Sequence, residues 1–371
     1  MDLFIDRDEL SRGLARVQNV VERRSTHPLL GHVLLHAREG GLRITATDTE
    51  VAFIGDLAAN VTTPGEIAVD AANLFQIARS LPEPTVQLTL GNPTRLDVVS
   101  GRARFRLPGF AADEFPQLPA FDGQSTIQVN EGAFRRLVDR THFAVATEDV
   151  RYGLNGVHLE QVQSDDGPRL RMVATDGHRL SAGQIAYEGD LSLTPRTLVP
   201  RKALAVIRKL LEPRDESIEI AFGDGAIRLV RPGQTFWFRL LDGEFPDYGS
   251  VLPQNHKMQV RIPTADFNSS LRRVLIIARD RTRAVKFAFG DGELAIELHS
   301  SGGGEVRETL PVEIEGESMV VGFNARFLQD VLSVVQGDAV VLEQNSATAP
   351  CMVRDPEDDS AFFVVMPMRL D

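Results

Sequence analysis

The segment RLRMVATDGHRLSAG, residues 169–183, has an altered second copy in the chain, and this repetition decides the fold. GLRITATDTEVAFIG, residues 41–55, places the same ATD triplet after an alternating strand, 128 residues earlier. An Asp at this point suits a turn, because its carboxylate accepts hydrogen bonds from the backbone N–H groups that follow it. The shared ATD is therefore predicted to be scaffold. GHRL, residues 177–180, is what sets the second copy apart.

Further matches extend the repeat in both directions. EFP triplets 130 residues apart stand in GFAADEFPQLP and LLDGEFPDYGSVLP, which begin at Gly109 and Leu240. Three amphipathic segments also correspond, with Leu74, Leu204 and Leu328 at the same place in each. A repeat of this length is too long for a solenoid and indicates duplicated domains.

Each copy opens with a short strand and a helix whose apolar residues recur at i, i+3, i+4 and i+7. The predicted helices are 8–24, 70–81, 131–142, 200–212, 264–283 and 324–336. Alternating strands with glycine-containing turns lie between them. The pattern predicts an α+β protein of three duplicated domains, each with two helices on antiparallel sheet. The predicted domains are residues 1–122, 123–254 and 255–371.

Composition narrows the class of protein. Of 371 residues, 43% are hydrophobic and 25% charged, as in a soluble globular protein. Apolar runs such as VLIIA, residues 274–278, are too short to cross a bilayer, and the N-terminus has no signal-peptide pattern. The single cysteine, Cys351, excludes an internal disulfide and is expected to be buried and inert. These features predict a cytoplasmic protein.

Charge is unevenly distributed over the predicted elements. The six helices carry 18 basic and 10 acidic residues in a chain of net charge −12, so the remainder carries −20. Ordinary solvated helix faces would account for this, and so would a dedicated positive surface. If the three copies share one orientation, such a surface would contact phosphates without reading bases.

Two candidate reactive sites are weak. Asp176 and His178 suggest acid–base chemistry, but that needs a nucleophile or a third orienting group, and the sequence has no G-x-S-x-G, GxxxxGK[ST] or HExxH. His32 and His36 have a metal-like spacing, but they lie in a predicted strand without further ligands nearby. The sequence therefore predicts no catalytic residues, no metal and no cofactor. A hydrolase that uses Asp176 and His178 remains an alternative.

The C-terminal segment AFFVVMPMRL, residues 361–370, is unusual for a chain end. Chain ends are normally polar and frayed, whereas this one is apolar, rich in methionine and broken by Pro367. Such a segment must pack on its own domain or bind a partner, and methionine suits adaptable binding surfaces.

Four segments together resemble one known family. EDVRYGLNG, MVATDGHRL, RLLDGEFPDY and the terminal VVMPMRL, on three duplicated domains, are similar to the bacterial sliding clamp, the beta subunit of DNA polymerase III. The resemblance covers the whole chain. It implies a DNA-clamp fold, a head-to-tail homodimer closing into a six-domain ring, and helices lining a hole for duplex DNA. It also implies a processivity factor without catalysis that tethers the replicative polymerase and is placed on DNA by a clamp loader.

The resemblance further implies three groups of functional residues. A cleft for clamp-binding-motif peptides would comprise Leu154, Thr175, Gly177, His178, Arg179, Leu180, Pro246, Val251, Asn324, Phe327, Val364, Val365, Met366, Pro367, Met368, Arg369 and Leu370. Arg24, Arg151, Tyr152, Arg201 and Lys202 would contact DNA, and Phe105, Ile276 and Ile277 would lie at the dimer interface. The sequence departs from the family pattern at Ala72, Ser250, Thr282 and Asp371.

One further alternative stays open. A repeat protein of this design could bind peptides as an adaptor without encircling DNA.

Overall fold

The computed structural model of the chain describes residues 1–22, 27–92, 94–118, 121–147, 152–194, 196–277, 284–299 and 304–370. In these ranges six α-helices are present. They are α1 Arg7–Val17, α2 Ala71–Ser80, α3 Glu131–Thr141, α4 Arg201–Leu210, α5 Thr264–Ile277 and α6 Ala325–Leu332. The predicted helices and their order are confirmed. No helix in the described ranges is both long and apolar enough to span a membrane.

The first helix is shorter than predicted. The sequence indicated residues 8–24, but α1 ends at Val17. Beyond it the N–H groups of Asn19 and Val20 bond to carbonyls only three residues back, at 3.1 and 3.0 Å, so the helix tightens and stops. Val20 is buried, which is why the apolar pattern continued past the true end of the helix. Helix α6 also ends early, at Leu332 instead of 336.

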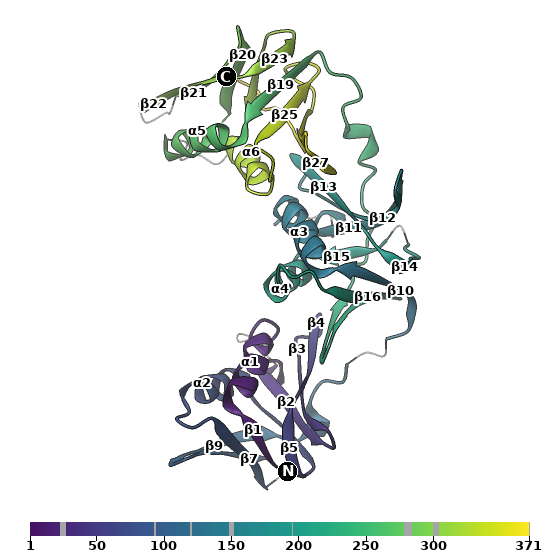
Figure 1. The fold of residues 1–371 in the computed structure, drawn as a ribbon, viewed down its shortest axis with the longest axis vertical. Helices are drawn as coiled ribbons and strands as arrows, with labels where there is room; N and C mark the ends of the chain where they lie inside the picture. The colour runs from purple at the N-terminus through teal and green to yellow at the C-terminus, as the bar shows by residue number, and fades with distance from the viewer. Residues whose placement is uncertain are drawn as a thin grey trace. The chain divides into compact units, whose positions relative to one another are not determined.

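The strands form three antiparallel sheets (Figure 1). In spatial order, the first contains β14 Glu188–Asp190, β10 Gly123–Asn130, β16 Ser217–Gly223, β17 Ala226–Arg231, β18 Gln234–Arg239, β4 Val51–Leu57, β3 Gly41–Thr47, β2 His32–Arg38, β6 Gly65–Asp70, β9 Ala103–Phe110, β8 Arg95–Ser100, β7 Thr85–Asn92, β1 Asp2–Asp6 and β5 Ala59–Thr63. The second contains β15 Leu198–Pro200, β11 Gly156–Ser164, β12 Gly167–Thr175, β13 Arg179–Ala186, β27 Asp358–Val365, β26 Cys351–Asp355, β25 Ala339–Gln344, β19 Met258–Pro263 and β23 Glu313–Gly316. The third contains β22 Glu305–Pro311, β21 Glu293–His299, β20 Val285–Gly290 and β24 Met319–Phe323.

Contacts divide the chain into two compact units. The first comprises Met1–Gly132, Tyr187–Ser192 and Lys202–Leu240, and the second comprises Ala133–Ala186, Leu193–Arg201 and Leu241–Asp371. Each unit contains strands from two neighbouring repeats, because one sheet in each runs from repeat to repeat.

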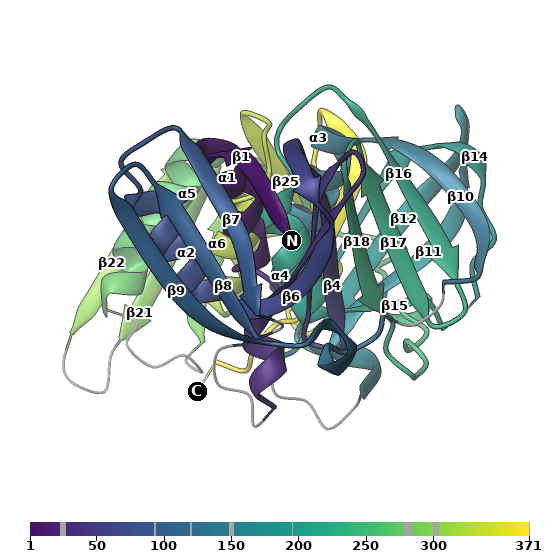
Figure 2. The same ribbon diagram turned by 90° about the horizontal axis from the view of Figure 1, so that it is seen from below.

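Two strand pairs make these connections. In the first unit β4 pairs with β18, and Figure 2 shows β4 beside β18, β17 and β16. In the second unit β13 pairs with β27. Trp237 lies opposite Ala52 in the first pair, and Val364 lies opposite Leu180 in the second. Ala52 and Leu180 each stand four residues after the repeated Asp. The two strand pairs between repeats, called here the first joint (β4–β18) and the second joint (β13–β27), therefore use the same register.

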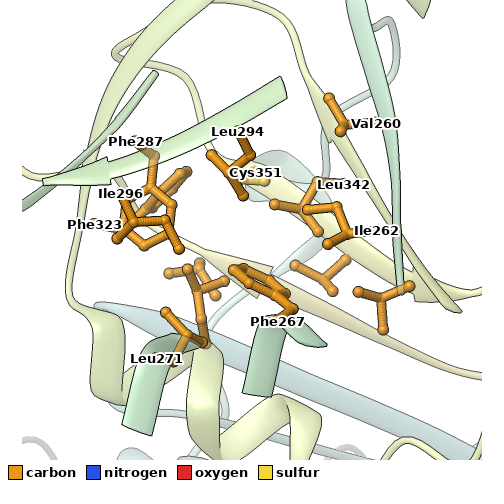
Figure 3. Close-up of a cluster of buried hydrophobic side chains, with 14 of the residues drawn as sticks. Val260, Ile262, Phe267, Leu271, Phe287, Leu294, Ile296, Phe323, Leu342 and Cys351 are labelled. Carbon is orange, nitrogen blue, oxygen red and sulfur yellow. The ribbon is translucent and has the colours of Figure 1, made fainter. Parts of the chain in front are cut away.

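The core of the third repeat shows how helix and sheet patterns meet (Figure 3). Phe267, Leu271 and Val274 have helical spacing along α5 and are fully buried. The ring of Phe267 packs edge-on against that of Phe287, with ring centroids 6.4 Å apart. Cys351 is buried among these apolar side chains, and burial raises the pKa of its thiol. The expected burial of Cys351 is confirmed.

Candidate functional site

The turn between β12 and β13 is built by the repeated Asp. The Oδ1 atom of Asp176 accepts the backbone N–H groups of His178 and Arg179, each at 3.0 Å. The Thr175 hydroxyl donates to the carbonyl of Arg179 at 2.6 Å. Gly177 has φ +85°, in the left-handed region that favours glycine. A tight turn therefore presents the side chains of His178 and Arg179.

The first repeat contains the same turn, bond for bond. Asp48 accepts the N–H groups of Glu50 and Val51 at 3.0 and 2.8 Å, and Thr47 donates to the carbonyl of Val51 at 3.0 Å. Thr49, the counterpart of Gly177, has φ +76°. The prediction that ATD is scaffold is confirmed. The contact between Asp176 and His178 runs through the backbone, so it gives a hydrolase no acid–base pair.

Arg179 fastens this turn to the third repeat. Its guanidinium pairs with Asp176 at 3.0 Å and with Asp330 of α6, and it donates to the carbonyl of Phe143 at 2.7 Å. It also lies over the rings of Phe143 and Phe327, 5.3 and 4.5 Å from their centroids. The side chain is 12% exposed. The Arg179 side chain is therefore held in one position, because its hydrogen-bond donors and its charge are engaged inside the protein.

A pocket of about 160 Å³ opens beside this turn. Its walls come from the end of the short helix η4 Tyr152–Leu154, from the turn and β13, from the segment after β18, and from the end of β27. It is lined by Leu154, Thr175, Gly177, Arg179, Leu180, Pro246, Asp247, Tyr248, Val251, Val364 and Met366. Most of these side chains are apolar, so the pocket suits an apolar anchor.

One wall of the pocket is held by a polar network behind it. The Tyr248 hydroxyl donates to Glu160, and Arg171 donates to that hydroxyl at 3.5 Å. Burial and the bond to Glu160 raise the pKa of Tyr248. Phe245 stacks on His158 with ring centroids 5.3 Å apart, and burial lowers the pKa of His158. The Tyr248 ring is therefore fixed from outside the pocket.

The C-terminal segment is docked at two points. The N–H of Met366 donates to the carbonyl of His178 at 2.9 Å, and the N–H of Met368 donates to that of Gly322 at 2.8 Å. A Cβ at Gly322 would lie 2.5 Å from the carbonyl oxygen of Met368, so the tail needs glycine there. Leu370 remains 41% exposed. The sequence left open whether this end packs on its own domain or binds a partner, and these contacts show that it packs on the protein.

The predicted cleft residues fall into two groups. The pocket is lined by Leu154, Thr175, Gly177, Arg179, Leu180, Pro246, Val251, Val364 and Met366. His178, Asn324, Phe327, Val365, Pro367, Met368, Arg369 and Leu370 do not line it.

Two members of the second group have contacts of their own. The His178 ring stacks on Phe327 with ring centroids 6.4 Å apart. Asn324 caps α6 by accepting the N–H of Arg326 at 3.1 Å.

Sequence reasoning missed Asp247 and Tyr248. Both stand between the predicted Pro246 and Val251, so their position was the available signal. Ser250, one of the departures from the family pattern, is exposed, and its hydroxyl donates to the carbonyl of Asp247 at 3.1 Å. Thr282 and Asp371 lie outside the described residues.

The equivalent place at the first joint is filled. Trp237 corresponds to Val364, and Ala52 corresponds to Leu180. Trp237 is 8% exposed and packs with Ala52, Leu118 and other apolar side chains. At the first joint a large side chain, Trp237, fills this place. At the second joint the smaller Val364 leaves an open pocket.

The predicted DNA-contact residues are only partly described. Arg24 and Arg151 lie outside the described residues, and of Tyr152 only the backbone is described, as the start of η4. Arg201 is exposed at the first position of α4.

Lys202, a predicted DNA contact, is engaged within the protein. Its ammonium group pairs with Asp48 at 2.8 Å and with Glu50 at 2.9 Å. Burial lowers the pKa of Lys202, but the bonds to the two carboxylates outweigh burial and raise it. The charge of Lys202 is therefore already compensated within the first joint.

Two other helix cations are also engaged. Arg140 is 10% exposed and pairs with Asp358, and Arg273 pairs with Glu308 at 2.6 Å. Arg140, on the predicted helix 131–142, does not add to an exposed positive surface, because its charge is buried and paired. The exposed cations on the helices include Arg12, Arg79, Arg136, Arg201, Arg208, Lys209, Arg272 and Arg326.

The predicted interface residues lie on two elements, the helix α5 and the strand β9. Ile276 is 72% exposed near the end of α5, and Ile277 is half-buried. Phe105 is half-buried on β9, which pairs with β8 along its length and with β6 only at Gly109 and Phe110.

A metal site at His32 and His36 finds no support in the structure. Both lie on β2, and the His32 ring contacts the carbonyl of Pro28 at 2.8 Å. Within the described ranges, no group of three or more His, Cys, Asp or Glu side chains could hold a metal ion.

Comparison with known proteins gives consistent results along the whole chain. Residues 1–119, 128–247 and 249–369 match the models of the N-terminal, central and C-terminal domains of the DNA polymerase III beta subunit. The beta sliding clamp of Caulobacter vibrioides is 35% identical over 373 residues, and that of Vibrio cholerae 34% over 375, with full coverage of both chains in each case. Among solved structures, the Caulobacter crescentus beta sliding clamp has a TM-score of 0.94 at 35% identity. The DNA polymerase III beta subunit from Pseudomonas aeruginosa has 0.92 at 33%, and full length is covered in both structures.

Proposed function

This chain belongs to the DNA polymerase III beta subunit family, the beta sliding clamps, and from that premise we propose how its residues perform the clamp function. The family is a non-enzymatic processivity factor of DNA replication. Held around duplex DNA, a clamp keeps the polymerase it binds at high effective concentration. The protein acts in the cytoplasm, with the replicative polymerase and a clamp loader as partners. Its domains are residues 1–122, 123–254 and 255–371.

The two joints within the chain carry the argument for ring closure. At each, the third strand of one sheet pairs with the last strand of the next repeat's sheet. β22 is the equivalent third strand of the last repeat and lies at a sheet edge. β9 is the equivalent last strand of the first repeat, with one edge open from Ala103 to Pro108 among the described strands. A second copy that pairs its β22 with this β9 repeats the same joint and closes a head-to-tail dimer.

The shared register predicts which residues meet at this third joint. Phe236 and Phe363 correspond to Phe105 and are fully buried, whereas Phe105 is half-buried. Transfer of the register places Phe105 opposite Val306 of the partner subunit and Arg106 opposite Glu305 of the partner subunit. Completion of the joint would bury Phe105 as its equivalents are buried.

The described basic helix residues support a role in holding DNA. Arg201, Arg208 and Lys209 on α4 are exposed, as is Arg136 on α3. Contacts from such side chains to phosphates would be sequence-independent and would weaken with salt. Arg24, Arg151 and Tyr152 remain predicted contacts. Lys202 would contact DNA only by leaving Asp48 and Glu50.

The pocket beside the Asp176 turn is the docking site for partner proteins. Its apolar lining takes aliphatic or aromatic anchors of a short extended peptide, and the tail from Met366 to Leu370 borders it. His178 and Phe327, stacked on each other, extend the cleft beyond the pocket.

A processivity assay tests the function. With a matching polymerase and clamp loader, the protein should lengthen extension products on primed circular DNA, and omission of the loader should abolish the effect. Removal of residues 366–371 should abolish peptide binding while light scattering still reports a dimer. A peptide-binding adaptor that does not encircle DNA would bind the peptide but leave the product lengths unchanged.

A further inference from the structure

One wall of the pocket depends on a carboxylate that does not line it. Tyr248 is the one aromatic side chain in the lining among the described residues. Its hydroxyl donates to the Glu160 carboxylate on β11, behind the wall. Arg171 on β12 pairs with the same carboxylate at 3.6 Å and donates to Gln184 on β13 at 2.8 Å. The acceptor of the Tyr248 hydroxyl is therefore itself held by neighbouring strands.

A ring stack holds the same segment three residues earlier. Phe245 stacks on the His158 ring of β11, with the two ring planes 11° apart. It also packs edge-on against Tyr248, with ring centroids 6.4 Å apart. Pro246 and Asp247, which lie between these two aromatic residues, line the pocket. This segment has no regular secondary structure, so its position depends on such side-chain contacts.

We propose that Glu160 is a positioning residue for peptide docking, which sets the affinity of the pocket by holding the Tyr248 hydroxyl. The inference rests on the proposed function of the pocket as a peptide-docking site. A Tyr248 ring that is already fixed loses no rotational freedom when an apolar anchor packs on it. A ring released from Glu160 would have to be ordered on binding, which would lower the affinity roughly three- to tenfold.

Two substitutions at Glu160 test this with the full-length protein and a labelled peptide that carries Leu and Phe anchors. Glu160→Met removes the acceptor at similar side-chain length, so the dissociation constant should rise about three- to tenfold. Glu160→Gln keeps an oxygen that can accept from the hydroxyl, so it should restore most of the affinity.

Glu343→Met is the matched control. Glu343 lies on β25 of the same sheet, pairs with Arg354 at 3.4 Å and does not line the pocket. Its substitution also leaves an arginine without its carboxylate, but peptide affinity should stay at the parental value.

A double-mutant cycle shows whether Glu160 acts through the hydroxyl. Tyr248→Phe should weaken peptide binding by a similar factor, because phenylalanine has no hydroxyl to hold. Glu160→Met should then cause little further loss in the Tyr248→Phe background. Absorbance at 295 nm gives an independent readout. Burial and the bond to Glu160 raise the pKa of the Tyr248 phenol, so Glu160→Met should lower that pKa.

The outcomes separate the two claims. Parental affinity in Glu160→Met would overturn the positioning role while peptide docking stands, even if the pKa of Tyr248 falls. Losses of affinity that add in the double variant would also overturn it, because Glu160 would then act by another route. Failure of the parent protein to bind the peptide would overturn the docking function and this inference with it.

Discussion

At the scale of single residues, the Asp that builds the turn and the cations that pair across repeats hold the two joints together. Asp48 and Asp176 build the same turn in two repeats, and that role was predictable because the sequence shows the motif twice. The partners of Arg179 were not predictable. Asp330 and Phe143 lie 151 and 36 residues away, and only the folded chain brings them to the guanidinium. For the same reason the sequence could not reveal that Lys202 is paired with Asp48.

A buried ion pair in the first unit gives a stability prediction. Glu131 is 1% exposed, and its carboxylate binds Arg231 and the N–H of Glu212 at 2.7 Å. Arg231→Met leaves this carboxylate without its cation, so the free energy of unfolding should fall by about 3–5 kcal/mol. Urea unfolding measures the change. The control Arg214→Met removes an exposed pair with Glu212 and should cost at most about 1 kcal/mol.

The Tyr248 hydroxyl predicts a pH dependence. Burial and the bond to Glu160 raise its pKa above the ordinary tyrosine value of about 10. A group whose folded pKa is raised contributes stability that is present below its unfolded pKa and lost as pH rises through the folded value. Stability should therefore fall above pH 10.

Absorbance at 295 nm tests this, because the chain has only three tyrosines. One transition should lie above the ordinary tyrosine range, and Tyr248→Phe should remove it. Persistence of that transition in Tyr248→Phe would refute the assignment.

At the scale of elements, two equivalent strand pairs have different uses. The β4–β18 pair is packed by Trp237 opposite Ala52, while the β13–β27 pair has Val364 opposite Leu180 and borders a pocket. The repeat predicted that the ATD turn before β4 and before β13 is scaffold. It did not predict that a side chain fills this place at one joint and leaves a pocket at the other. That difference depends on side-chain volumes across strands that are far apart in sequence.

Exchange of these residues should convert one joint into the other. In Leu180→Ala with Val364→Trp, the indole should occupy the pocket, as Trp237 does beside Ala52. Peptide affinity should fall at least tenfold while the melting temperature stays close to that of the parent. Val364→Trp alone should be less stable, because overpacking costs about 1–3 kcal/mol. Peptide binding at parental strength in the double variant would show that the pocket is not the docking site.

At the scale of the molecule, the edges of β9 and β22 that are open among the described strands form the proposed dimer interface. Sequence repetition and family resemblance gave the six helices and the three-domain order. The helix ends and the compensated charges required the structure, since they depend on contacts between repeats. Arg104 and Arg106 are exposed on β9, and Glu305 and Arg307 are exposed on β22.

A charge exchange tests the register of the closing joint. Arg106→Glu should weaken the dimer about five- to tenfold per interface by facing Glu305 of the partner subunit, and Glu305→Arg should do the same. The double variant should recover much of the loss, because the pair is restored with reversed polarity. Sedimentation measures each dimer constant. If the losses of dimer affinity from the two single variants simply add in the double variant, Arg106 and Glu305 do not face each other.

The central claim is that the protein encircles DNA. The most direct test measures whether a ring closed by a covalent bond stays on circular DNA. Arg104→Cys and Arg307→Cys lie opposite each other in the predicted closing joint, and buried Cys351 should not compete for oxidation. The variant would be loaded onto nicked circular DNA, oxidised and washed in high salt. The account predicts that it stays on the circle and is released when the DNA is cut. Loss from the intact circle after cross-linking, or retention on the linear DNA, would contradict encirclement.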